Sequence, residues 1–133
     1  MLVTIEKVLL LKQIPVFKTV SNMALSDLMA VSEEKTIKKG ERLIVKDQQN
    51  RYVYFLLSGS LEESEKNNKK NITAHAVVGL ESVFLMAQAG KDVVAQQESI
   101  VLVVERGKLY RMMALHPSLA GVILNELSLM IRK

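Results

Sequence analysis

The chain has 133 residues, the length of a single domain, and it is long enough to bury a core of its own. Apolar residues make up 49% of the sequence and charged residues 24%, a balance that is typical of folded globular proteins and excludes a disordered tail. The net charge of +4 is modest, and the absence of cysteine excludes disulfides, iron–sulfur clusters and thiolate zinc sites.

Two short helices are predicted within the first thirty residues. Thr4 and Ser21 are residue types that cap a helix, and Pro15 separates the two helices because proline cannot continue one. In each helix, apolar residues recur at the three- and four-residue spacing of a buried stripe. The stripes consist of Ile5, Val8 and Leu9 in the first helix and of Leu25, Leu28 and Met29 in the second.

The middle of the chain predicts a series of short strands. Runs rich in β-branched and aromatic residues follow one another at the close spacing that is typical of a barrel or sandwich. The runs cover residues 35–42, 43–45, 52–57, 72–78, 92–94 and 100–104, and another strand begins at Leu61. Residues 52–57 are apolar throughout, so we expect this strand to be buried on both faces. Residues 62–71 are almost wholly polar and are expected to form the exposed tip of a hairpin.

Two further helices are predicted at the end of the chain, over residues 108–113 and 117–133. Pro117 suits the first position of the second helix, where its missing N–H costs nothing. This helix carries two neighbouring apolar stripes, a wider arc than one packing face needs. One part is expected to lie on the sheet and the remainder to meet a partner. Leu119, Ile123, Leu127 and Met130 form the first stripe and are the predicted dimer contacts of this helix, and Ala120, Leu124 and Ile131 form the second stripe.

Helices, then strands, then helices indicate an α+β fold. The order of features resembles that of cyclic-nucleotide-binding domains, and it does so at residues 14–17, 39–44, 52–61 and 77–82 and at His116-Pro117. The resemblance covers about residues 10–133 and is closest to the sensor domains of catabolite-activator and oxygen-responsive bacterial transcription regulators. It implies one domain over residues 1–133, a β jelly roll (double-stranded β-helix) with N-terminal helices and a long C-terminal dimerisation helix. Gly40 and Gly59 then fall at tight turns between strands, which need positive φ.

Residues 77–82 fall where this family places its phosphate-binding cassette. The resemblance therefore implies ligand contacts from Gly79, Leu80, Glu81, Ser82 and Lys91. In the family, a glutamate directly after the glycine binds the ribose hydroxyl and a downstream arginine pairs with the phosphate. Here Leu80 separates Gly79 from Glu81, and Lys91 replaces the arginine without offering its planar fork. Asp92, beside this lysine, would repel a phosphate. These departures predict atypical or lost nucleotide binding.

The sequence offers no constellation for catalysis or metal binding, so we expect neither an enzyme nor a metal site. His75 and His116 are the only histidines, too few and too far apart for a cupin-like metal site. They are also the only candidate haem ligands, and the cofactor prediction is otherwise none apart from a cyclic nucleotide. The glutamates at positions 62, 63 and 65 are expected to be solvated charges.

These observations support a regulatory ligand-sensing module that answers a small-molecule effector and signals through its C-terminal helix as a homodimer. It would be, for example, the effector domain of a transcription regulator, and nucleic acid would be bound only through a domain not present in this chain. The alternative is a ligand-free interaction or dimerisation domain on the same fold. No apolar run approaches the roughly 18 residues that span a bilayer, so we expect a cytoplasmic protein without a membrane partner.

Overall fold

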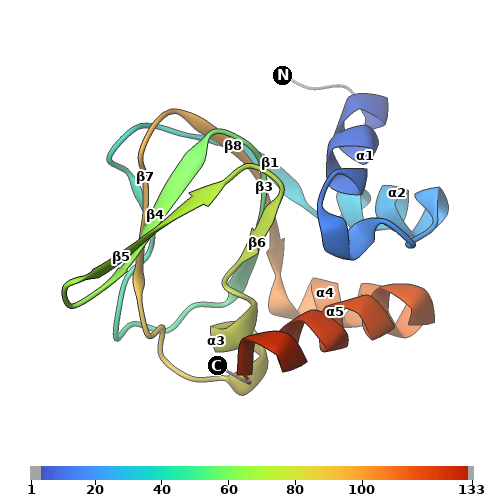
Figure 1. The fold of residues 1–133 in the computed structure, drawn as a ribbon. Helices are drawn as coiled ribbons and strands as arrows, with labels where there is room; N and C mark the ends of the chain where they lie inside the picture. Colours follow the sequence, from blue (N-terminus) through green and yellow to red (C-terminus); the bar gives the residue numbers. More distant parts are fainter. Residues whose placement is uncertain (1–3, 132–133) are drawn as a thin grey trace.

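The structure, a computed structural model, describes residues 4–131 (Figure 1). The described residues form two four-stranded antiparallel sheets. One sheet has the order β1 (Glu33–Ile37), β8 (Ser99–Glu105), β3 (Tyr52–Ser58) and β6 (Ala76–Val78). The other has the order β2 (Arg42–Ile44), β7 (Asp92–Ala95), β4 (Ser60–Glu65) and β5 (Asn68–Thr73). The predicted α+β jelly roll is therefore confirmed.

Helices from both ends of the chain gather beside the sheet that contains β3, while α3 lies near the end of the last helix (Figure 1). Their bounds are α1 (Thr4–Lys12), η1 (Pro15–Phe17), α2 (Asn22–Ala30), α3 (Leu80–Leu85), α4 (Arg106–Leu115) and α5 (Pro117–Ile131). Ser21 caps α2 as predicted, because its hydroxyl accepts a 3.1 Å hydrogen bond from the backbone N–H of Ala24. The last two positions of the helix predicted to end at 133 lie outside the described residues.

Strand β3 is buried on both faces and joins two apolar cores. Val53, Phe55 and Leu57 point to the helices, and Phe55 meets Phe17 of η1 with the ring centroids 5.3 Å apart. Leu56, on the opposite face, packs between the two sheets. This alternation confirms the prediction for residues 52–57, and it ties the helical layer and the jelly roll to one strand.

The polar stretch 62–71 is not a hairpin tip, which corrects the prediction from its composition. Strands β4 and β5 pair from Ser60↔Thr73 to Glu65↔Asn68, so only Lys66 and Asn67 form the turn. The two strands can carry polar side chains because β5 is the edge strand of its sheet, and one face and one edge of this ladder meet solvent.

The predicted strand 72–78 is also divided. Strand β5 ends at Thr73, and β6 begins at Ala76 in the other sheet. The chain crosses between sheets at His75, whose φ of +75° breaks the extended run. The predicted strand 35–42 is likewise shorter, since β1 ends at Ile37 and β2 begins at Arg42.

The apolar face predicted for the first helix is wrong in part. Ile5 is 68% exposed and Leu9 59% exposed, whereas Leu11 is fully buried. Helix α1 packs against α2, η1 and β3, and Val8 and Leu11, three residues apart, face these neighbours. Which face of α1 is buried therefore depends on how the helix packs against its neighbours, and not on where its apolar residues are most frequent.

The first stripe of α5 packs mainly into the core of its own chain. Leu119 and Ile123 are fully buried, and Leu127 is 9% exposed. They lie against the helical core because α5 packs on η1, α3 and α4. This corrects the interpretation of these residues as a surface for a second copy. The outward face of α5 instead presents Leu124 and Leu129.

Gly40 and Gly59 lie at turns with φ of +87° and +99°. At Gly59 a side chain is excluded twice, because a Cβ would also stand 2.7 Å from the Cα of Ser99. Ser99 is fully buried and its hydroxyl accepts a 3.2 Å hydrogen bond from the N–H of Ser60. The turn after β3 is thus pressed directly against the start of β8.

The position of Leu119 makes a testable prediction about α5. Leu119→Ala should lower the free energy of unfolding by about 2–5 kcal/mol, as expected for a leucine truncated in a core. The loss, measured by urea unfolding, should not depend on protein concentration. Leu115→Ala is the control, since Leu115 is 63% exposed. A loss that shrinks on dilution would instead place Leu119 in an interface between copies.

Candidate ligand-binding site

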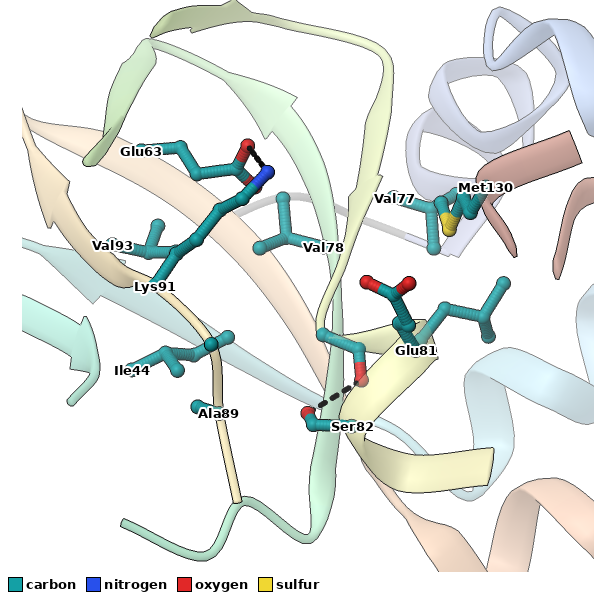
Figure 2. Close-up of a pocket in the computed structure, with 13 residues that line it drawn as sticks. Ile44, Glu63, Val77, Val78, Glu81, Ser82, Ala89, Lys91, Val93 and Met130 are labelled. Atoms are coloured by element: carbon teal, nitrogen blue, oxygen red, sulfur yellow. Dashed lines mark hydrogen bonds and ion pairs between the residues drawn. The ribbon is translucent and has the colours of Figure 1, made fainter. Parts of the chain in front are cut away.

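A cavity of about 120 Å³ opens between the jelly roll, α3 and the end of α5 (Figure 2). All five residues predicted to contact a ligand line this cavity, although Lys91 lies just before β7, apart from the other four. The full lining consists of Ile44, Glu63, Val77, Val78, Gly79, Leu80, Glu81, Ser82, Ala89, Gly90, Lys91, Val93 and Met130. The structure therefore places the predicted site residues around one space.

Helix α3 is fixed at its start by a glycine. Gly79 has a φ of +90°, and a Cβ there would stand 2.7 Å from the carbonyl oxygen of Tyr52. Leu80 and Val83, three residues apart, are buried in the helical core and hold α3 against the sheet. Leu80 is therefore an anchor of the helix, and it is Glu81 that lies exposed at the cavity.

Asn50 positions the cassette, and sequence reasoning missed it. Its side-chain N–H donates to the carbonyl oxygen of Tyr52 at 2.9 Å and to the hydroxyl of Ser82 at 3.1 Å. Ser82 in turn donates to the carbonyl oxygen of Gly79 at 3.3 Å. Asn50 is only 9% exposed, so these bonds replace water around a buried amide. The only signal in the sequence was an asparagine at the end of a polar turn.

Lys91 does not stand free in the cavity. Its ammonium lies 3.1 Å from a carboxylate oxygen of Glu63 on β4, and Figure 2 shows the side chain extending to that partner. The two side chains are 49% and 22% exposed, so the pair is partly shielded from water. Glu63 was expected to be a solvated charge, and the structure instead makes it part of the cavity wall. The register of β4 against β7, which sets Glu63 opposite Val93, brings the two charges together.

Asp92 turns away from this space, contrary to the expectation that it would repel a bound phosphate. A carboxylate oxygen accepts a 2.8 Å hydrogen bond from the backbone N–H of Lys46 and lies 3.9 Å from the guanidinium of Arg42. Lys91 lies just before β7 and pairs with Glu63, whereas Asp92 begins the strand and contacts the β2 side, so the two residues have different surroundings. Asp92 stabilises the start of β7 against β2.

The wall opposite Lys91 combines a free carboxylate with an apolar side chain from the last helix. The carboxylate of Glu81 makes no hydrogen bond or ion pair with any of the described residues. Figure 2 shows its carboxylate directed toward the side of the cavity where Val77 and Met130 lie. Met130 belongs to α5, so an occupant of the cavity would touch α3 and α5 at once.

Residues 34–116 match the cyclic nucleotide-binding domain family. The chain belongs to that family. It is a family of regulatory ligand-binding domains, and the predicted resemblance is confirmed. No curated protein sequence matches the chain.

Solved structures of the cyclic nucleotide-binding fold agree. The catabolite activator protein of Thermus thermophilus has a TM-score of 0.80 and 13% identity over 89% of this chain and 58% of its own. The regulatory domain of Toxoplasma gondii PKA with cAMP has a TM-score of 0.81 and 14% identity over 94% and 49%. The sensor domain of the transcriptional regulator DNR from Pseudomonas aeruginosa has a TM-score of 0.76 and 19% identity over 97% and 92%. The chain thus spans only about half to three fifths of the first two proteins.

The two histidines of this cyclic nucleotide-binding domain occupy unrelated places. The Nε2 atom of His116 lies 2.8 Å from a carboxylate oxygen of Asp27, which ties α2 to the junction of α4 and α5. His75 lies at the crossover between the sheets, and its Nδ1 atom is buried without a partner. Among residues 4–131 no group of three potential metal ligands comes together. Within the same residues, no helix is both long enough and apolar enough to cross a membrane.

The role of Asn50 can be tested directly. Asn50→Ala should destabilise the domain by about 1–3 kcal/mol, because it leaves the Ser82 hydroxyl and two backbone groups of Tyr52 without their partner. Urea unfolding measures the loss, and Gln48→Ala, an exposed side chain of the same turn, should stay within about 0.5 kcal/mol of wild type. Equal stability of the two variants would show that Asn50 does not hold the cassette.

Proposed function

We propose that this chain is a regulatory ligand-sensing domain whose cavity takes a small-molecule effector without the usual cation–phosphate pair. The observation that carries the proposal is that Met130 of α5 lines the same cavity as the cassette helix α3. An effector can shift a conformational equilibrium only through contacts that differ between the two states. A side chain of α5 in the cavity wall supplies such a contact, and it makes the last helix the output of the domain.

The surroundings of Lys91 support atypical ligand recognition. A phosphate held by this ammonium would have to share it with the carboxylate of Glu63 at 3.1 Å, and the phosphate would then face Glu63 and Glu81 together. An arginine can serve two acceptors with its planar fork, whereas the compact ammonium of lysine offers no such fork. Binding of a cyclic nucleotide in the manner of the family would therefore start from an unfavourable arrangement of charge.

The wider context of the proposal comes from the similar structures. Both a catabolite activator protein and the sensor domain of a transcriptional regulator share this fold. We therefore assign the chain to the effector part of a transcription regulator, with DNA contacted by a different domain. A homodimer through α5 would use its outward face, where Leu124 is 52% exposed and Leu129 48% exposed.

A second candidate is a ligand-free interaction domain on the same fold. The observation that favours it is the exposed apolar end of α3, where Leu85 is 54% exposed and Met86 69% exposed. Apolar side chains that gather on a surface often mark a protein contact. The two candidates differ in one respect, which is whether any small molecule enters the cavity.

Methyl-labelled methionine NMR tests this difference, because Met130 reports on the cavity. A panel of cyclic nucleotides, small amines, alcohols and carboxylates is titrated against the domain. Under the proposed function, at least one class shifts the Met130 methyl signal together with the backbone amides of α3. Met23, which is 71% exposed on α2, provides the internal control. A panel that leaves both α3 and Met130 unchanged would favour the ligand-free interaction domain.

Cyclic nucleotides are not expected to stabilise the domain against thermal unfolding. Cyclic AMP and cyclic GMP at millimolar concentration are expected to leave the Tm of the wild type unchanged, since Lys91 is held by Glu63. Glu63→Gln keeps the side-chain size, removes the partner of Lys91 and should make binding measurable as a positive Tm shift. A rise of several degrees in the wild type that is lost in Lys91→Ala would contradict atypical recognition.

The proposed dimer makes its own prediction. Light scattering should give about twice the 14.9 kDa of the single chain. Leu124→Asp should return the mass to that of a monomer, because it places a charge in an apolar contact. Ser118→Asp, an exposed change near the start of α5, should leave the dimer intact. A monomeric wild type would contradict dimerisation through this helix.

A further inference from the structure

A larger groove adjoins the cavity and shares part of its wall. The groove has a volume of about 680 Å³ and is bordered by η1, the β5–β6 crossover and α5. Glu63, Val77, Glu81, Lys91 and Met130 line both spaces. A ligand seated in the cavity can therefore extend into the groove, and the charges of both spaces act on it together.

The charges around this joint site are unevenly paired. Three carboxylates, those of Glu63, Glu81 and Glu126, and two ammonium groups, those of Lys70 and Lys91, line the two spaces. Both lysines lie near the same carboxylate, that of Glu63, but only Lys91 forms an ion pair with it. Lys91 lies 3.1 Å from Glu63, and Lys70 stands directly opposite Glu63 on the neighbouring strand. The strand side of the site therefore carries two ammonium groups against one carboxylate, so its own residues already balance the charge of Glu63.

Within residues 4–131 the helix side has no such compensation. The carboxylates of Glu81 on α3 and Glu126 on α5 make no hydrogen bond or ion pair with these residues. An anion in the site would meet two uncompensated carboxylates, whereas a cation would be attracted to both. Between these charges the cavity wall is apolar, with side chains that include Val77, Val78 and Met130.

We propose that this site selects a small organic cation, a protonated amine on a branched apolar body, in place of an anionic nucleotide. The inference rests on the proposed function, since it names the chemical class that the same cavity senses. The ammonium group pairs with the carboxylate of Glu81, on the side of the site that Glu126 also lines. The apolar body fills the cavity against Val77 and Met130. A cavity of about 120 Å³ suits a body of this size, because a dry apolar cavity of about 150 Å³ holds benzene.

The test uses three probes of one shape and different charge: isopentylammonium, isopentanol and isovalerate. Each is titrated against the whole chain, and the amide signals of α3 and the methyl signal of Met130 are followed by NMR. The amine should bind tightest and the carboxylate weakest. Added salt should weaken binding of the amine while leaving that of the alcohol unchanged, since only the amine pairs with a charge.

Variants locate the charge that matters. Glu81→Gln should raise the Kd of the amine about threefold, the effect expected for losing one exposed ion pair, and leave the Kd of the alcohol unchanged. Glu65→Gln is the matched control, because it removes the same charge from β4 at a position outside the cavity and the groove. An equal loss of affinity for the amine in the two variants would show that the selectivity comes only from the net charge of the domain, and it would overturn the proposal.

The remaining outcomes separate this inference from the proposed function. If isovalerate or a cyclic nucleotide binds more tightly than the amine and shifts both α3 and Met130, the cation proposal fails while ligand sensing stands. If none of the probes or cyclic nucleotides shifts either reporter, the cation proposal and the proposed function fail together.

Discussion

The two-faced burial of β3 is the constraint on which the rest of this structure depends. One face of the strand carries the helical core through Phe55, and the other carries the jelly-roll core through Leu56. The start of the same strand also fixes the cassette. The carbonyl oxygen of Tyr52 leaves room only for glycine at position 79 and accepts a hydrogen bond from Asn50. The strand therefore sets the position of α3, and with it the shape of the cavity.

Much of the fold was predictable from the sequence because its signals are local. A six-residue apolar run, two glycines at turns and a proline at each of two helix boundaries are local signals, and each corresponds to a local feature of the backbone. The polar ladder of β4 and β5 gave no such signal. Its side chains are solvated on an edge of the sheet, so composition alone cannot distinguish these strands from a loop.

The site was predictable only in part, for a different reason. Gly79, Glu81 and Ser82 lie together in sequence, and their closeness around a cavity follows from one short helix. The pair of Lys91 with Glu63 joins residues 28 positions apart and depends on the register of two strands. Register is fixed by side-chain alternation across a whole sheet, which a single sequence does not reveal. For the same reason the sequence did not reveal the role of Asn50, because that role depends on a hydrogen bond to Ser82, 32 positions away.

Helix α5 shows what periodicity can and cannot specify. The spacing of its apolar residues predicted two stripes, but which stripe faces the core depends on where the helix docks. Docking on η1, α3 and α4 buries Leu127 in the core, directs Met130 to the cavity and leaves Leu124 outward. One helix thus contributes side chains to the core, to the cavity and to the surface. Because packed helices move as units, a displacement of α5 at Met130 also moves its outward face. Under the proposed function, this geometric link is what lets a binding event in the cavity alter the surface that α5 presents to a partner.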